Sequence, residues 1–167
     1  YSMTSHLEGN EVFILSFPTQ NFTICYDFQT KMFHERSSYN NLVWLPSCTS
    51  SFGVNQEIAG DSITGNLYFL DFNTFTDNGQ PIIRTRISPH YFTSEDRSVV
   101  SKFLVEFQPG TALPSGQGSD PLVGLETSKN YGNTYGTKRF KHLGKQGQYL
   151  KRVYWNMLGT AYDWVFK

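Results

Sequence analysis

Apolar and polar positions alternate with a period of two along most of this chain. Residues 22–28, Phe-Thr-Ile-Cys-Tyr-Asp-Phe, place their apolar side chains on one side and Thr, Cys and Asp on the other, as a β-strand does. Residues 11–17 form an apolar run that Pro18 ends, since proline cannot donate to a sheet ladder. A short turn then leads to residues 32–36. Three strands with short connections predict an antiparallel meander, the unit of a propeller blade or a sandwich.

The same rhythm predicts strands along the rest of the chain. They are expected at residues 43–45, 56–60, 65–72, 82–88, 99–108, 122–127, 139–143, 148–156 and 161–167. Residues 109–121 are dense in Gly, Ser and Pro and predict a loop. No window keeps a 3.6-residue period with helix caps. We therefore predict an all-β protein of antiparallel meanders, propeller-blade-like over residues 1–78 and β-sandwich-like over residues 79–167.

A short internal repeat supports the comparison with propeller blades. The tripeptides Tyr26-Asp-Phe28 and Leu70-Asp-Phe72 each close an apolar strand, and their aspartates, Asp27 and Asp71, lie about 44 residues apart. That spacing suits one blade of a propeller.

A second motif predicts a tight turn. The pattern Ser128-x-Asn130-x-Gly132-x-Thr134-Tyr135 resembles the Asp-box, the Ser-x-Asp-x-Gly-x-Thr-Trp hairpin turn of sialidase-type propellers, with Asn for Asp and Tyr for Trp. Asparagine can hydrogen-bond its own turn, and glycine adopts positive φ without strain. In those families the box is structural and lies away from the active site. It therefore predicts a β-hairpin corner built on Ser128, Asn130, Gly132 and Tyr135, and no glycosidase activity.

Charge is distributed unevenly although the net charge is zero. No Asp or Glu occurs between Thr127 and Tyr162, a segment that holds half of all Lys and Arg residues. The segment is either a solvated strand face or a surface that meets an acidic protein or nucleic acid. We predict a partner-binding surface formed by Lys138, Arg139, Lys141, Lys145, Lys151, Arg152, Tyr149 and Trp155.

Catalytic and metal-binding patterns are lacking. The four histidines have no metal-ligand spacing, and residues 71–77 begin like a calcium loop but lack its glycine and its bidentate glutamate, so we expect a plain turn. Cys25 and Cys48 are expected as free, packed thiols. No run of 18 apolar residues predicts a membrane span. We expect no enzyme activity, no metal and no cofactor.

Three stretches together carry a family resemblance. They are residues 11–19 with 26–27 and 34–38, residues 65–71 with 79–82, and residues 144–155 with 158–159 and 163–166. Through them the chain is similar to the C-terminal part of the packaged-DNA stabilisation proteins, the tail accessory factors of P22-like short-tailed phages. The start at Tyr1 would then mean that further propeller blades precede the chain.

The resemblance implies a non-enzymatic virion protein, made in the host cytoplasm and built into the tail. Such proteins form a ring of copies below the portal and its adaptor, extend the DNA channel and keep pressurised DNA in the capsid. They also carry the plug or needle and the tailspikes. Contact of the basic segment with packaged DNA or with one of these proteins is expected on this basis.

Two other classes stay open from the residues alone. A sialidase-like propeller is suggested by the Asp-box; it would need an arginine cluster and a Tyr/Glu nucleophile pair, of which Arg84 and Arg86 could supply only part. A carbohydrate-binding β-sandwich is suggested by the aromatic content of 16%. Glycosidase turnover would identify the first, and glycan binding without turnover the second.

Overall fold

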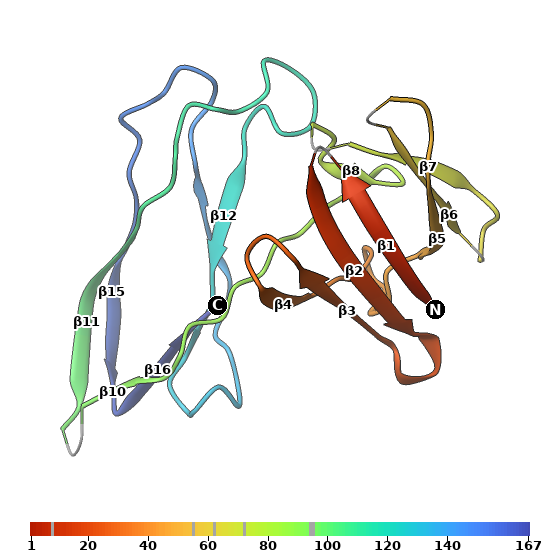
Figure 1. The fold of residues 1–167 in the computed structure, drawn as a ribbon. Coiled ribbons are helices and arrows are strands. Elements are labelled where there is room, and N and C mark those ends of the chain that lie inside the picture. Colours follow the sequence, from red (N-terminus) through yellow and green to blue (C-terminus); the bar gives the residue numbers. More distant parts are fainter. Residues whose placement is uncertain (8, 55, 62, 72, 94–95) are drawn as a thin grey trace. The chain divides into compact units, whose positions relative to one another are not determined.

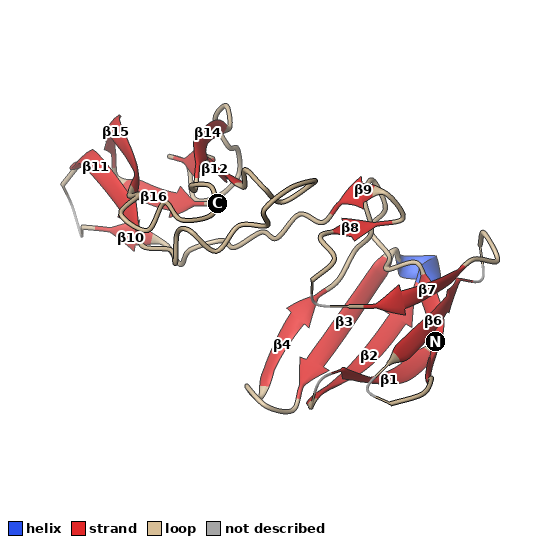
Figure 2. Ribbon diagram, turned by 90° about the horizontal axis from the view of Figure 1, so that it is seen from above, coloured by secondary structure: helices blue, strands red, loops and turns tan. Residues whose placement is uncertain are grey.

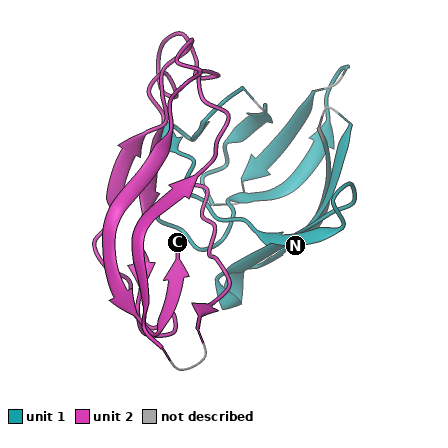
Figure 3. Ribbon diagram, turned by 90° about the vertical axis from the view of Figure 1, so that its left-hand side faces the viewer, with its two compact units in different colours: residues 1–83 teal, residues 84–167 magenta. Residues whose placement is uncertain are grey.

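The protein is all-β and divides into two compact units. The computed structural model describes residues 1–7, 9–54, 56–61, 63–71, 73–93 and 96–167, and its strands pair antiparallel (Figure 1). The units are Tyr1–Ile83 and Arg84–Lys167 (Figure 3), whereas the sequence pattern predicts a boundary after residue 78. The predicted fold class is confirmed. In the described parts of the chain, no helix is long and apolar enough to cross a membrane.

The first unit contains two antiparallel meanders and a short hairpin. Its elements are β1 (Ser2–Leu7), β2 (Asn10–Phe17), the 3₁₀ turn η1 (Pro18–Gln20, blue in Figure 2), β3 (Phe22–Asp27), β4 (Met32–Glu35), β5 (Pro46–Ser51), β6 (Glu57–Asp61), β7 (Leu67–Leu70), β8 (Thr76–Asp77) and β9 (Gln80–Pro81). The sheets have the orders β1-β2-β3-β4, β5-β6-β7 and β8-β9. The first order is the meander expected of a propeller blade. Assembly of such sheets into a propeller stays a prediction.

Alternation along β2 and β3 builds the core of the four-stranded sheet. Val12, Ile14 and Cys25 are buried together with Met3 of β1. The partly buried Trp44 packs against this cluster. In β3 the side that faces the core carries Thr23 and Cys25, whereas Phe22, Ile24 and Tyr26 are only partly buried. The apolar period of two therefore predicted the strand but not which of its sides faces the core.

A buried carboxylate links the two meanders of this unit. Glu57 of β6 accepts hydrogen bonds from Ser5 Oγ at 2.6 Å and from the backbone N of His6 at 3.1 Å, both in β1. Thr49 of β5 adds a bond from its Oγ1 to the carbonyl oxygen of Thr4 at 2.9 Å. Because Glu57 is buried, these donors replace the water that its carboxylate loses on folding.

The Asp-Phe repeat marks a recurring turn. Asp27 accepts a hydrogen bond from the N of Gln29, and Asp71 accepts one from the N of Asn73 and one from Thr74 Oγ1. Phe72, the last residue of the second tripeptide, lies outside the described residues. The repeat therefore encodes a side-chain-capped turn at the end of a strand.

The same turn occurs at Asp61, the last residue of β6, although the sequence has no Asp-Phe pair there. Its carboxylate accepts bonds from the N of Ile63 at 2.7 Å and from Thr64 Oγ1 at 2.6 Å. The feature that the turns share is Asp-x-x-Thr, in Asp27-Phe-Gln-Thr, Asp61-Ser-Ile-Thr and Asp71-Phe-Asn-Thr.

The second unit combines one pair of long strands with several short ones. Its strands are β10 (Tyr91–Phe92), β11 (Ser98–Val105), β12 (Leu122–Leu125), β13 (Thr127–Ser128), β14 (Arg139–His142), β15 (Val153–Ala161) and β16 (Asp163–Phe166). They form the sheets β11-β15, β12-β14 and β10-β16-β13. The ladder of β11 and β15 runs from Ser98–Ala161 to Val105–Val153.

Two tryptophans dominate the core of the second unit. Trp155 of β15 and Trp164 of β16 are buried with Leu125, Val153 and Leu158. Each indole N–H reaches a backbone carbonyl, Trp155 Nε1 that of Arg139 at 3.0 Å and Trp164 Nε1 that of Ser98 at 3.3 Å. The core thus buries large apolar rings without leaving their polar atoms unpaired.

The strand predicted at residues 43–45 is wrong. The backbone N–H groups of Val43, Trp44 and Leu45 donate to side-chain oxygens of Asn41, Thr23 and Ser38, respectively, and not to a ladder. The strand in this region is β5, which starts directly afterwards at Pro46. Strand β1 was not predicted at all.

The strand predicted at residues 82–88 is also wrong. The boundary between the two units falls inside it, and Ile82, Ile83 and Ile87 are exposed. The N of Ile82 bonds to Phe75 in the first unit, whereas the N of Ser88 bonds to Phe166 in the second. A β-branched run therefore serves here as the connection between the units.

The predicted strands at residues 148–156 and 161–167 have different limits. Strand β15 starts only at Val153 and continues to Ala161 through a bulge, where Met157 has φ +55° and the register shifts opposite Val100–Lys102. A bulge breaks the period of two, so the sequence pattern ended the strand too early. In β16 the predicted alternation fails because Asp163, Trp164 and Val165 are all buried.

Replacing Trp164 with alanine is expected to lower the free energy of unfolding of the second unit by about 3–5 kcal/mol, because the ring is fully buried. Urea titration followed by near-UV circular dichroism measures the change. Leu150→Ala is the control; Leu150 is 96% exposed, so its loss should change stability by less than about 0.5 kcal/mol. Equal effects of the two substitutions would contradict this core.

Acid is expected to weaken the first unit through its Asp-x-x-Thr turns. Bonds from Thr30 and Gln29 hold the pKa of Asp27 below its usual value, and bonds from Asn73 and Thr74 do the same for the pKa of Asp71. Burial raises the pKa of Asp61, but bonds from Thr64 and Ile63 outweigh it, so this pKa is also lowered. Carboxylates with lowered pKa stabilise the fold above the unfolded value near 3.9, and the stabilisation is lost as the pH falls through the folded pKa.

The pH dependence can be tested at Asp61. Asp61→Asn should destabilise the first unit at pH 7 and approach the wild-type stability as the pH falls below the folded pKa, because the wild-type carboxylate is then protonated as well. Urea unfolding at a series of pH values checks this, with Asp77→Asn in the same unit as the control. A stability difference for Asp61→Asn that stays constant with pH would refute the assignment.

Candidate partner-binding surface

The Asp-box-like turn is organised by the buried hydroxyl of Ser128. Ser128 Oγ donates to Asn130 Oδ1 at 2.8 Å and accepts from the backbone N of Gly132 at 3.0 Å. Asn130 Oδ1 also accepts from the N of Thr134, and its Nδ2 donates to Thr134 Oγ1, at 2.9 and 2.8 Å. The structure therefore brings Ser128, Asn130 and Gly132 together in one hydrogen-bonded turn.

Two consecutive residues of this turn have positive φ. Gly132 has φ +77°, as its motif position implies, and Tyr131 has φ +59°, which the sequence did not reveal. Asn133 N closes the turn on the carbonyl oxygen of Asn130 at 3.1 Å. The ring of Tyr135 lies 5.3 Å from Lys167 Nζ, in cation–π contact.

The chain reverses around the turn and forms a hairpin. Gly136 N donates to the carbonyl oxygen of Thr127 at 2.9 Å, and β14 then pairs antiparallel with β12. The turn thereby sets the position of β14, which carries the first basic residues of the predicted surface.

The predicted basic residues occupy two different places. Arg139 and Lys141 are exposed on β14, and Lys138 immediately before it lies 3.7 Å from Glu126 Oε1. Tyr149, Lys151 and Arg152 instead lie in a groove, whereas Lys145 is exposed in the preceding loop. The set is therefore not one continuous stripe, although the chain is free of acidic residues over this range.

Two acidic residues from outside the segment moderate its charge near β14. Glu126 pairs with Lys138, and its other oxygen lies 3.2 Å from Lys167 Nζ. Asp120 Oδ1 lies 3.0 Å from His142 Nδ1. The surface around β14 is therefore less cationic than the sequence suggested.

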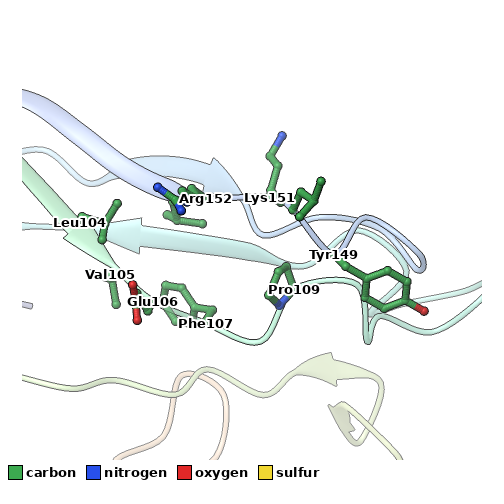
Figure 4. A pocket seen from close by; sticks show the side chains of 10 residues that line it. Leu104, Val105, Glu106, Phe107, Pro109, Tyr149, Lys151 and Arg152 are labelled. Atoms are coloured by element: carbon green, nitrogen blue, oxygen red, sulfur yellow. The ribbon is translucent and has the colours of Figure 1, made fainter.

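The groove lies where the β11–β15 ladder ends and has a volume of about 260 Å³. Residues 104–107 and 109 line one side and residues 149–153 the other (Figure 4). Its walls are mostly apolar or aromatic, with Glu106, Lys151 and Arg152 as the charged residues among the lining ones. The side chain of Leu150 is almost completely exposed.

The wall formed by Tyr149 is held by a close approach to Gly110. A Cβ atom at Gly110, which has φ +81°, would lie 2.5 Å from Tyr149 Cδ1, so no other residue fits there without displacing the ring. Gly147 N also donates to the carbonyl oxygen of Gly110 at 3.1 Å. The two loops that flank the groove are therefore tied together.

Trp155 does not belong to the surface. It was predicted as a partner-binding residue, but it is 3% exposed and packs in the core of the second unit. In β15 it alternates with the exposed Tyr154, so the strand directs it inward. The sequence could not decide which of two neighbouring aromatics faces the solvent.

The other side of the groove was missed because it comes from a distant part of the sequence. Leu104, Glu106, Phe107 and Pro109 follow the pattern of a strand running into a loop, and nothing in their types points to binding. Only the pairing of β11 with β15 brings them to Tyr149.

The cysteines are free, as expected, but only one is packed. Cys25 is buried, which raises the pKa of its thiol to about 11 despite the opposing effect of Arg36, and Cys48 is exposed. A thiol with a raised pKa is a poor nucleophile.

Residues 71–77, which begin like a calcium loop, contain the Asp71 turn. In the described part of the chain, no group of three or more His, Cys, Asp or Glu residues could hold a metal ion.

The second unit matches a known protein family. Residues 83–167 match the family described as bacteriophage P22 Gp10, β-sandwich. The chain belongs to this family. The resemblance to P22-like tail accessory factors is therefore confirmed, and so is the β-sandwich class of the C-terminal part. The chain is a structural protein of a phage virion, and its partners are other phage structural proteins. No curated protein matches it.

Removing the Ser128 hydroxyl is expected to destabilise this P22 Gp10 family sandwich. Ser128→Ala leaves the N of Gly132 without its acceptor, and we expect a loss of about 1–3 kcal/mol in unfolding free energy. Asn130→Asp, which restores the residue usual in the box, should be tolerated, because a carboxylate can accept from Ser128 and Thr134 alike. Thermal unfolding measures both, with the exposed Thr137→Ala as the control. A neutral Ser128→Ala would show that the turn does not depend on this hydroxyl.

Proposed function

We propose that this protein is a tail or head–tail connector component that extends the DNA channel, stabilises the packaged DNA and docks other tail proteins. Membership of the P22 Gp10 family is the observation that carries the proposal. In this proposal the protein acts as a homo-oligomeric ring, its neighbours are the portal adaptor, the needle or plug and the tailspike, and it performs no catalysis.

The close packing of the core of the second unit supports a mechanical role. Its core combines two buried tryptophans with paired long strands, and close-packed interiors of this kind resist deformation. A component that holds DNA under pressure needs such resistance.

The basic residues that lack carboxylate partners support a docking role. Within the described residues, no ion pair joins Arg139, Lys141, Lys145, Lys151 or Arg152 to an acid. Unpaired surface cations raise the rate and selectivity of association with acidic surfaces. Packaged DNA and acidic tail proteins are both acceptable neighbours for these residues on charge alone.

Charge reversal in the phage tests the proposal. Lys138, Arg139, Lys141, Lys145 and Arg152 are replaced together by Glu, which should reduce the yield of particles that retain DNA by roughly tenfold or more, since each contact would become repulsive. The ratio of filled to empty heads after density-gradient separation measures the effect.

A matched control is available at exposed cations outside the segment. Reversal of Lys31, Arg84 and Arg86 should leave the yield of filled particles unchanged, and the purified variants should unfold at the wild-type temperature. Normal assembly and DNA retention by the five-residue variant would refute a role for the basic segment.

A further inference from the structure

We propose that the groove between residues 104–109 and 149–153 binds a short, extended, acidic segment of another virion protein through one apolar anchor side chain. This inference rests on the proposed docking function and names the chemistry of the docked partner. Its support comes from the size, the lining, the charge and the backbone of the groove.

The groove has room for an anchor side chain. Its volume of about 260 Å³ suffices for one large side chain and part of a neighbour, and is below the ~300–1,000 Å³ typical of small-molecule sites. Leu104, Phe107 and Tyr149 expose 40–68% of their surface there although they are apolar or aromatic. Exposed rings and aliphatic groups around a concave surface are typical of protein contacts.

The wall of the groove is preorganised. The Tyr149 ring lies directly on Gly110, and the loop before it is closed by Gln148, whose N donates to the carbonyl oxygen of Lys145 and whose Oε1 accepts from the N of Lys145, both at 3.0 Å. A wall that is already ordered loses less conformational entropy when a partner binds.

The positive charge at the rim of the groove favours an acidic partner. Lys151 and Arg152 lie at the groove, Lys145 lies in the loop before it, and none has a carboxylate within ion-pair distance among the described residues. Carboxylates beside an anchor residue would find these cations unoccupied. Glu106 in the opposite wall repels an anion that runs through the groove on both sides, as a continuous phosphate backbone would. A peptide can place its carboxylates beside Lys151 and Arg152 and an apolar side chain beside Glu106, so we favour a peptide over DNA.

The backbone at the groove favours an extended ligand. The register of β11 and β15 ends at Val105–Val153, so Glu106 and Phe107 on one side and Lys151 and Arg152 on the other continue beyond the ladder. Extended peptides bind by adding main-chain hydrogen bonds to unpaired strand backbone, while pockets select their side chains.

Selection from a random dodecapeptide library displayed on its own mRNA, with the purified 167-residue chain as bait, tests the proposal. Enriched sequences should contain an aromatic or large aliphatic residue next to Asp or Glu. A synthetic peptide of the enriched type should bind about tenfold more weakly to the variant Lys151→Glu/Arg152→Glu. Leu150→Ala, at an almost completely exposed side chain of the rim, should also weaken binding without changing the fold.

The matched control is Arg139→Glu/Lys141→Glu, which makes the same change of charge on β14 and should bind the peptide within about twofold of wild type. Absence of enrichment, enrichment of basic sequences, or equal binding by both double variants would overturn the proposal. So would a duplex of about 20 base pairs that binds more tightly than the peptide and loses affinity in Lys151→Glu/Arg152→Glu.

Failure of this test and failure of the proposed function are distinguishable. The library selection uses the isolated chain, whereas the proposed function is measured by the DNA content of phage particles. A phage that loses DNA after reversal of the basic segment, with no peptide bound by the purified chain, would refute the groove alone.

Discussion

The ladder between β11 and β15 is the constraint on which the second unit depends. It pairs residues 48 to 63 positions apart and places Trp155 in the core, while the adjoining β16 places Trp164 there. The bulge at Met157 lets β15 change direction without ending, so that one strand contributes to the core along its whole length. The candidate groove opens where this ladder stops. The pairing of β11 with β15 therefore determines both the core of the second unit and the position of the groove.

The Asp-box-like turn has a complementary role. Its hydrogen bonds are internal to residues 128–134, and Ser128 is completely buried, so it is a rigid corner that returns the chain to β12 as β14. The resemblance to a sialidase motif therefore reflects backbone geometry. The absence of glycosidase activity stays a prediction.

Electrostatics act differently in the two units. In the first unit, carboxylates serve the fold, since Glu57 links two meanders and the Asp-x-x-Thr turns cap strand ends. In the second unit, Glu126 and Asp120 neutralise part of the basic segment near β14, whereas the cations at the groove form no ion pair in the described residues, although Glu106 lines the opposite wall. The basic segment therefore has two parts in the structure. Near β14 its charge is partly neutralised by carboxylates, and at the groove its cations are free of ion pairs in the described residues.

The amino-acid sequence by itself determined the fold class, most strands, the capped corner at Ser128 and the phage family, because these depend on local periodicity, turn chemistry and characteristic stretches. It also identified Tyr149, Lys151 and Arg152 as candidates for binding. Tertiary structure alone decided that Trp155 is buried, that residues 82–88 connect two units, and that residues 104–109 form the other wall of the groove. The physical reason is that burial and grooves depend on which distant strands pair, and the pairing of β11 with β15, including its bulge, leaves no local signal in either strand.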